Sequence, residues 1–125
     1  MLNILLATTR PEAMQPFTEA LSSDPEVHLD QVASSVDVLA AVRASAPHLV
    51  IIDADLPDIA PLELVRKLLM ANAMVNTAVI SSLSEELFHE ASEGLGVLSR
   101  VPVVPDRSDA VALLVKLRSI LGVMG

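Results

Sequence analysis

Apolar and polar positions along the chain follow two periods, one typical of strands and one typical of helices. Short apolar runs without helical spacing predict five strands. Segments whose apolar residues recur every three or four positions separate these runs and predict five helices. The predicted strands are Leu2–Ala7, Val27–Ala33, Leu49–Ile52, Thr77–Ser82 and Val97 to about Val101. The predicted helices run from about Pro11 to Leu21, from Ser34 or Ser35 to Ala46, from Pro61 to Ala71, from Ser84 to about Glu93 and from Ser108 to Leu121.

The strict alternation of strands and helices indicates the fold class. It predicts a three-layer α/β/α sandwich with a five-stranded parallel sheet, because parallel strands need a crossover helix between them. Leu49–Ile52 is the most apolar run and is expected at the centre, whereas the amphipathic Val27–Ala33 is expected near an edge. The chain has 125 residues and no linker or repeat, so we expect one domain over residues 1–125.

The charge and composition exclude several classes of function. Sixteen acidic residues against eight basic ones give a net charge of −8, and no basic cluster is present. We therefore expect neither nucleic-acid binding nor attachment to an anionic membrane, since both need grouped Lys and Arg. Cysteine is absent, which fits a reducing cytoplasm and excludes thiolate chemistry. The N-terminal stretch has no secretion signal, and no apolar run is long enough to span a membrane, so we expect a cytoplasmic protein.

Polar residues follow four of the predicted strands. The carboxyl ends of parallel strands meet at one edge of the sheet, where ligands of such folds bind. A carboxylate, several hydroxyl groups and one guanidinium are therefore expected to converge there. They are Thr8 and Thr9 after the first strand, Asp53 after the third, Ser81, Ser82 and Ser84 after the fourth, and Arg100 at the fifth.

The stretch "PHLVIIDADLPDIAPLELVRKL" resembles the middle of a response-regulator receiver (CheY-like) domain. That pattern has a proline, an apolar strand, the phosphoacceptor aspartate, three residues, a second proline and a helix of the "LELLRRL" type. Pro47, Asp53, Pro57 and the helix "LELVRKL" fall in register with it. The order and length of the elements extend the resemblance over the whole chain. It implies the flavodoxin/CheY-like (βα)5 fold, a role in two-component phosphorelay signalling, and Asp53 at the phosphoacceptor position.

The same resemblance implies a degenerate phosphorylation site. In a working receiver, two acids after the first strand bind Mg²⁺ with the acceptor aspartate and a backbone carbonyl, and this chain has Thr8 and Thr9 in their place. Hydroxyl groups are poor main ligands for Mg²⁺, so phosphoryl transfer to Asp53 would lack its principal charge stabiliser. We expect a pseudo-receiver without a cofactor, in which Mg²⁺ matters only if phosphorylation is retained. A cation shared by Asp53 and Asp55 is an alternative, although two acids so close in sequence are more typical of a polar turn.

The remaining receiver positions are matched loosely. Ser81, Ser82 or Ser84 could fill the hydroxyl position after the fourth strand. The usual lysine is replaced by Arg100 in an ungapped match from Gly96, and by Val101 if the following proline is aligned. Arg100 could then pair with Asp53, and Asp55 is expected to act through its backbone.

The resemblance also implies a surface for partners, made of the fourth helix, the fifth strand and the last helix. The segments "EGLGVLSRVPVVP" and "VALLVKLRSILGVMG" are unusually apolar for that surface. We therefore expect a non-enzymatic signalling domain that binds a histidine kinase, an output protein or a second copy through this face. Packing of an amphipathic helix on its own sheet would explain these segments equally well.

Two alternative functions remain open. One is a divergent receiver that is still phosphorylated on Asp53. The other is a flavodoxin-like enzyme that binds a nucleotide or flavin. The enzyme is disfavoured because the loop "ATTRPEAM" has none of the glycines that usually bring backbone N–H groups close to a phosphate.

Overall fold

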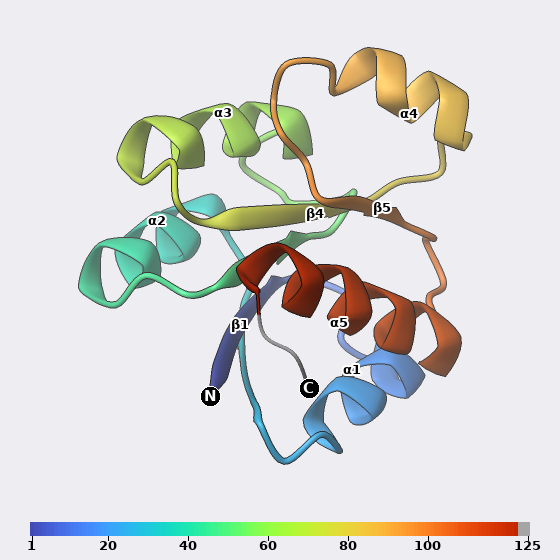
Figure 1. Ribbon diagram of the computed structural model, residues 1–125. Coiled ribbons are helices and arrows are strands. Elements are labelled where there is room, and N and C mark those ends of the chain that lie inside the picture. The colour runs from blue at the N-terminus through green and yellow to red at the C-terminus, as the bar shows by residue number, and fades with distance from the viewer. Residues whose placement is uncertain (123–125) are drawn as a thin grey trace.

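The computed structural model describes residues 1–122 and contains one parallel sheet between two layers of helices (Figure 1). The strand order is β2-β1-β3-β4-β5, and every neighbouring pair is parallel. The predicted α/β/α sandwich is therefore confirmed. The strands are β1 (Leu2–Ala7), β2 (Val27–Val32), β3 (Leu49–Ile52), β4 (Asn76–Ile80) and β5 (Ser99–Val101). The helices are α1 (Gln15–Ser22), α2 (Ser35–Ala44), α3 (Pro61–Ala71), α4 (Glu85–Ala91) and α5 (Arg107–Leu121).

Two apolar clusters hold the layers together, one on each face of the sheet. Alternate residues of β1 point to opposite faces, so Ile4 and Leu6 pack with α1 and α5, whereas Leu5 packs with α2, α3 and α4. All four residues of β3 are buried, as expected for a central strand covered on both faces. Figure 1 shows α1 and α5 below the sheet, α3 and α4 above it, and α2 at the left below α3. None of the helices within residues 1–122 is long and apolar enough to cross a membrane.

The first helix begins later than predicted, at Gln15 instead of Pro11. Residues 11–14 form turns, and the N–H groups of Ala13, Met14 and Gln15 each donate to the carbonyl three residues earlier, as in Gln15 N to Glu12 O at 3.3 Å. The cause is Pro16, which has no N–H to donate to Glu12 and so cannot continue a helix that began at Pro11. Pro16 instead occupies the first turn of α1, where the missing donor is harmless.

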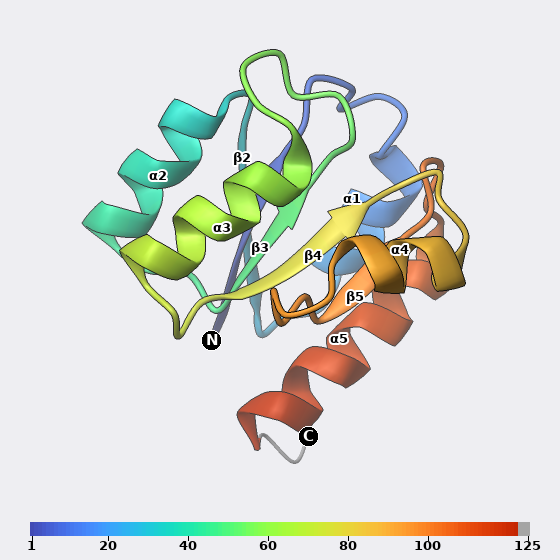
Figure 2. The same cartoon turned by 90° about the horizontal axis from the view of Figure 1, so that it is seen from above.

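Several other boundaries also differ from the predicted ones. The fifth strand begins at Ser99, not Val97, and β4 ends at Ile80, before the serines. The predicted cap of α4 is confirmed, since the Ser84 hydroxyl accepts from Leu87 N, and Ser34 caps α2 in the same way. The apolar C-terminal segment quoted above ends in residues 123–125, which lie outside the described residues. Figure 2 shows the arrowheads of β3 and β4 pointing to the same edge of the sheet, where the candidate site lies.

Candidate functional site

Asp53 lies directly beyond β3, and its side chain is completely buried. Its backbone N–H donates to Ala7 O at 2.9 Å, which extends the pairing of β3 with β1 by one residue. The carboxylate turns back onto its own chain, and Oδ1 accepts the N–H of Ala54 at 2.7 Å. A buried carboxylate is tolerated only when charge and hydrogen bonds compensate its lost hydration.

Arg10 supplies that compensation. Its Nε donates to Asp53 Oδ2 at 3.0 Å and its Nη2 donates to Oδ1 at 2.7 Å, which is the two-pronged geometry of a strong arginine–carboxylate pair. Nη2 also donates to Val103 O at 3.0 Å. Arg10 thus links the loop after β1 to the end of β3 and to the loop after β5.

Thr8 completes the surroundings of the carboxylate. Its hydroxyl donates to Asp53 Oδ2 at 2.7 Å and accepts the backbone N–H of Arg10 at 2.9 Å. The second bond holds the loop in the shape that directs the guanidinium toward Asp53. Thr9 is exposed and donates from its hydroxyl to Asp55 O at 3.3 Å, which joins the loop after β1 to the turn after β3.

The hydrogen-bonding capacity of Asp53 is filled by these contacts. Each carboxylate oxygen accepts two of the four hydrogen bonds, and an ionised carboxylate has about four lone-pair sites. Burial by itself would raise the pKa of Asp53. The hydrogen bonds from Arg10, Thr8 and Ala54, together with the charge of Arg10, outweigh burial and place this pKa below its ordinary value. The same pairing raises the pKa of Arg10.

The donor set does not suit a divalent cation. Mg²⁺ needs carboxylate oxygens with free lone pairs, whereas the two side chains that follow β1 carry only hydroxyl groups. Both oxygens of Asp53 are already bound to a fixed positive charge, which would repel a cation. Within residues 1–122, no cluster of three acidic, histidine or cysteine side chains could hold a metal ion. The shared Asp53–Asp55 cation considered above therefore lacks support in this geometry.

The guanidinium that meets Asp53 is not the one predicted from the sequence. Arg100 instead donates from Nη1 to Ser81 O at 3.2 Å, and its Nη2 lies 3.4 Å from Glu85 Oε1. The alternation of side chains along the strands explains this. Arg100 is the β5 neighbour of Val79, and both side chains lie on the α2–α3–α4 face of the sheet. Asp53 follows Ile51 by two residues, so its side chain points to the opposite, α1–α5 face. Val101, the other predicted lysine-equivalent position, is buried on that α1–α5 face.

The three serines after β4 mostly serve local structure. Ser81 Oγ accepts Leu83 N at 3.1 Å within the turn, and Ser84 caps α4. Ser82 is exposed. The hydroxyl contact on Asp53 comes from Thr8 instead.

Asp58 and Pro57 belong to the exposed turn between β3 and α3. The Asp58 carboxylate accepts the backbone N–H of Ser35 at 3.1 Å and its hydroxyl at 2.6 Å. These bonds lower the pKa of Asp58, and they tie the turn to the first residue of α2. The three acids of "DADLPD" thus have separate roles.

Comparison with known proteins identifies the fold. No protein-family model and no curated protein matches the sequence. The chemotaxis response regulator CheY4 of Vibrio cholerae has a TM-score of 0.81 over 94% of this chain and 98% of that one, at 13% identity. The receiver domain of the Francisella response regulator 1452 has a TM-score of 0.81 over 96% and 99%, at 11% identity. A two-component response regulator from Legionella pneumophila has a TM-score of 0.78 over 95% and 99%, at 16% identity.

These likenesses establish that the chain has the flavodoxin/CheY-like (βα)5 fold of receiver domains. At such low sequence identity, these likenesses establish the fold and nothing about function. Function therefore has to be argued from the site around Asp53.

Proposed function

We propose that this chain is a receiver-type signalling domain that acts by binding other proteins and not by Mg²⁺-dependent phosphorylation. The observation that carries this proposal is the filled and buried state of Asp53, whose two carboxylate oxygens accept four hydrogen bonds. In this view the side chain at the phosphoacceptor position has become a structural partner of Arg10.

The chemistry of phosphoryl transfer supports this proposal. An acceptor carboxylate must direct a free lone pair at the phosphorus atom, and a cation must neutralise the phosphoryl oxygens in the transition state. Asp53 has no free lone pair, and freeing one would mean breaking a contact to Arg10, Thr8 or Ala54. Arg10 neutralises the carboxylate without any exchangeable ion.

The proposed partner surface is the face formed by α4, β5 and α5. Leu87 of α4 is 54% exposed, and Glu85 of the same helix lies 3.4 Å from Arg100 of β5. The Nε of Arg100 is buried and has no hydrogen-bond partner within residues 1–122. Arg100 borders a cavity of about 190 Å³ together with Ser99 and Lys116. We propose that a signalling protein, such as a histidine kinase or an output protein, or a second copy of the chain, binds here.

The proposal is tested with a small phosphodonor. The protein is incubated with Mg²⁺ and acetyl phosphate, or with beryllofluoride, and followed by intact mass and by heteronuclear NMR. We expect no covalent adduct and no shifts around Asp53. A phosphoryl adduct that disappears in Asp53→Asn would overturn the proposal and favour the divergent receiver. A nucleotide or flavin that copurifies with the chain would favour the enzyme instead.

A second experiment tests the role of Arg10 directly. The double variant Thr8→Asp/Thr9→Asp restores the acids that a receiver uses, but it leaves Arg10 on Asp53. We expect Mg²⁺ titration to shift the NMR signals near Asp53 only when Arg10→Ala is added to this pair, because the guanidinium then no longer fills the site. Equal Mg²⁺ affinity in the double and triple variants, both folded by circular dichroism, would show that Arg10 is not the obstacle.

A further inference from the structure

The two edges of the sheet are protected to different degrees. β5 has three residues and is followed directly by Pro102, so it offers little backbone for pairing with another strand. β2 has six residues, contains no proline, and is paired on its inner side with β1 along its whole length. An edge strand of this kind is a template for a further strand.

The backbone groups of β2 that face outward can be identified from its pairing with β1. Leu2 N donates to Glu26 O at 2.6 Å and Thr8 N donates to Val32 O at 3.0 Å, so the even-numbered residues of β2 direct their backbone groups toward β1. The N–H and C=O groups of Leu29 and Gln31 therefore point away from the sheet. The C=O of Val27 also points away from the sheet, whereas the N–H of Val27 donates to Asp24 O at 3.1 Å.

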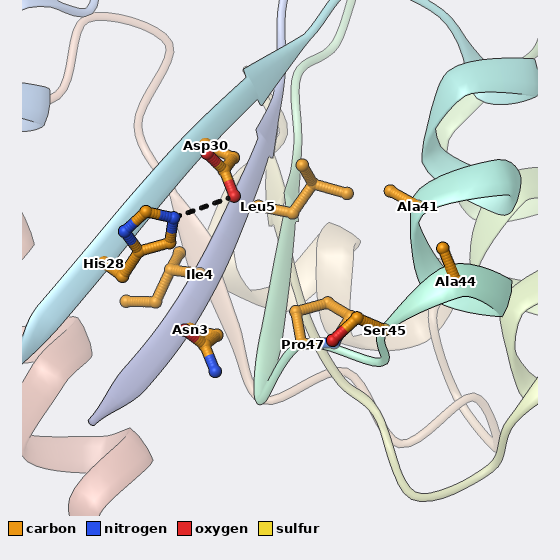
Figure 3. Close-up of a pocket in the computed structure, with 9 residues that line it drawn as sticks. All are labelled: Asn3, Ile4, Leu5, His28, Asp30, Ala41, Ala44, Ser45 and Pro47. Carbon is orange, nitrogen blue, oxygen red and sulfur yellow. Dashed lines mark hydrogen bonds and ion pairs between the residues drawn. The ribbon is translucent and has the colours of Figure 1, made fainter.

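The side chains of His28 and Asp30 lie on the face of β2 that points toward α2. Figure 3 shows them on the edge strand, joined by the 3.2 Å contact between Nε2 and Oδ2. Both remain exposed, by 55% and 66%, because α2 does not cover this part of the sheet. A groove of about 400 Å³ remains between β2 and the small side chains Ala41 and Ala44 of α2.

We propose that β2 pairs antiparallel with β2 of a second copy of this chain, about a two-fold axis at Leu29. In this register Leu29 lies opposite Leu29 and Val27 lies opposite Gln31. His28 lies opposite Asp30 of the second copy, and Asp30 lies opposite its His28. The two five-stranded sheets then form one continuous sheet across the axis.

The backbone geometry supports this register. The outward-facing residues Val27, Leu29 and Gln31 fall at the hydrogen-bonded positions of an antiparallel pair. Leu29 exchanges two bonds with its counterpart, and the N–H of Gln31 reaches the C=O of Val27 in each direction. His28 and Asp30 fall at the non-hydrogen-bonded positions, where opposite side chains are closest.

The charges select this register over its neighbours. A pairing centred on Asp30 would place the two Asp30 side chains opposite each other. A pairing centred on His28 would place Asp30 opposite Glu26. Both put like charges in direct contact, which destabilises a strand pair, whereas the Leu29 register places each Asp30 carboxylate opposite a His28 ring, which can donate a hydrogen bond to it and is a cation only when protonated.

The size of the contact and the charge of the chain determine the expected strength. A single strand pair buries less than the roughly 1,200 Å² of a standard interface, so the dimer is transient. Two chains of net charge −8 also repel each other, and salt screens this repulsion. We therefore expect association at high protein concentration, strengthened by moderate salt.

The test measures association and the protection of individual amides. Sedimentation velocity is run up to about 1 mM protein, with hydrogen exchange followed by NMR in parallel. The Leu29 and Gln31 amides should become protected as concentration rises, whereas those of His28 and Asp30, already bound to β1, should not change. A chain that stays monomeric throughout, or association that protects other amides and leaves these two unchanged, would overturn the proposal.

Charge exchange across the two-fold axis supplies the decisive variants. His28→Asp puts two acids opposite each other at both contacts and should weaken association about tenfold. The double variant His28→Asp/Asp30→His re-creates the Asp–His contacts with the two positions exchanged and should restore it. Met74→Asp adds the same single negative charge in the exposed loop before β4 and should have no effect. Failure of the double variant to restore association would contradict the register.

A backbone variant gives an independent check. Gln31→Pro removes an outward N–H without touching the bonds to β1, and should abolish association. Association that survives in a folded Gln31→Pro variant would overturn the strand pairing. If that variant does not fold, the charge-exchange series still decides.

Discussion

Removing the Arg10 side chain should destabilise the fold because it leaves a buried charge without its counter-charge. Arg10→Met keeps much of the side-chain volume but removes two of the four hydrogen bonds on Asp53. Breaking one side of a buried ion pair costs about 3–5 kcal/mol. The Arg10 side chain is 25% exposed, so water screens part of the interaction, and we expect a loss of about 2–3 kcal/mol at neutral pH.

The assay is urea or thermal unfolding followed by circular dichroism, since the chain has no Trp or Tyr for fluorescence. A loss of this size lowers the melting temperature by roughly 6–10 °C in a domain of this length. Arg66→Met is the matched control, because Arg66 and Glu63 form an exposed pair at 3.7 Å whose removal should cost under about 0.5 kcal/mol.

A double-mutant cycle separates the pairing from other effects of the substitution. Asp53→Asn removes the charge that Arg10 neutralises, so Arg10→Met should cost much less in the Asp53→Asn background. We expect a coupling of about 2 kcal/mol between the two sites. A coupling near zero, or Arg10→Met as harmless as Arg66→Met, would refute the role assigned to this pair.

Three further predictions concern pH, a helix end and a loop. The pKa of Asp53 lies below its ordinary value of 3.8, so the ionised carboxylate stabilises the fold above about pH 4. This stabilisation is lost as the pH falls further. The free energy of unfolding of Asp53→Asn should not show this decrease. Ser35→Ala removes the hydroxyl bound to Asp58 and should cost about 1 kcal/mol in urea unfolding, and an unchanged midpoint would contradict the link between α2 and the turn. Gly96→Ala should cost about 1 kcal/mol, because φ is +64° and the space around an added Cβ is empty, so the cost is backbone strain alone; Gly96→Asn should cost less.

The sequence predicted the fold well because the fold depends on local patterns. The alternation of apolar runs and helical segments was sufficient for the parallel sheet, for the central place of β3 and for Asp53 at a strand end. Boundaries were less accurate where one residue decides them, as Pro16 does for the start of α1. These errors shift an element by a few residues and leave the arrangement of the sheet unchanged.

The partner of Asp53 was predicted incorrectly because it depends on contacts between distant residues. Arg10 and Asp53 are separated by 43 positions, and only Arg100, not Arg10, was predicted to pair with Asp53. The faces of the strands decide between them, and the register of β5 on β4 becomes known only in three dimensions. One signal was present in the sequence, since Arg10 follows β1 by three residues at the edge where Asp53 was expected. The role of Asp58 at α2 likewise depends on a contact across 23 positions.

The bond from Arg10 to the carbonyl of Val103 gives the site a thermodynamic link to the start of α5. Val103 lies three residues before Asp106, whose side chain caps that helix. Consider a ligand of α5 that binds more tightly when the Arg10–Asp53 pair is formed. The bound ligand must then stabilise this pair by the same free energy by which the pair stabilises ligand binding. Binding of such a ligand to α5 can then be detected as a change in the pKa of Asp53.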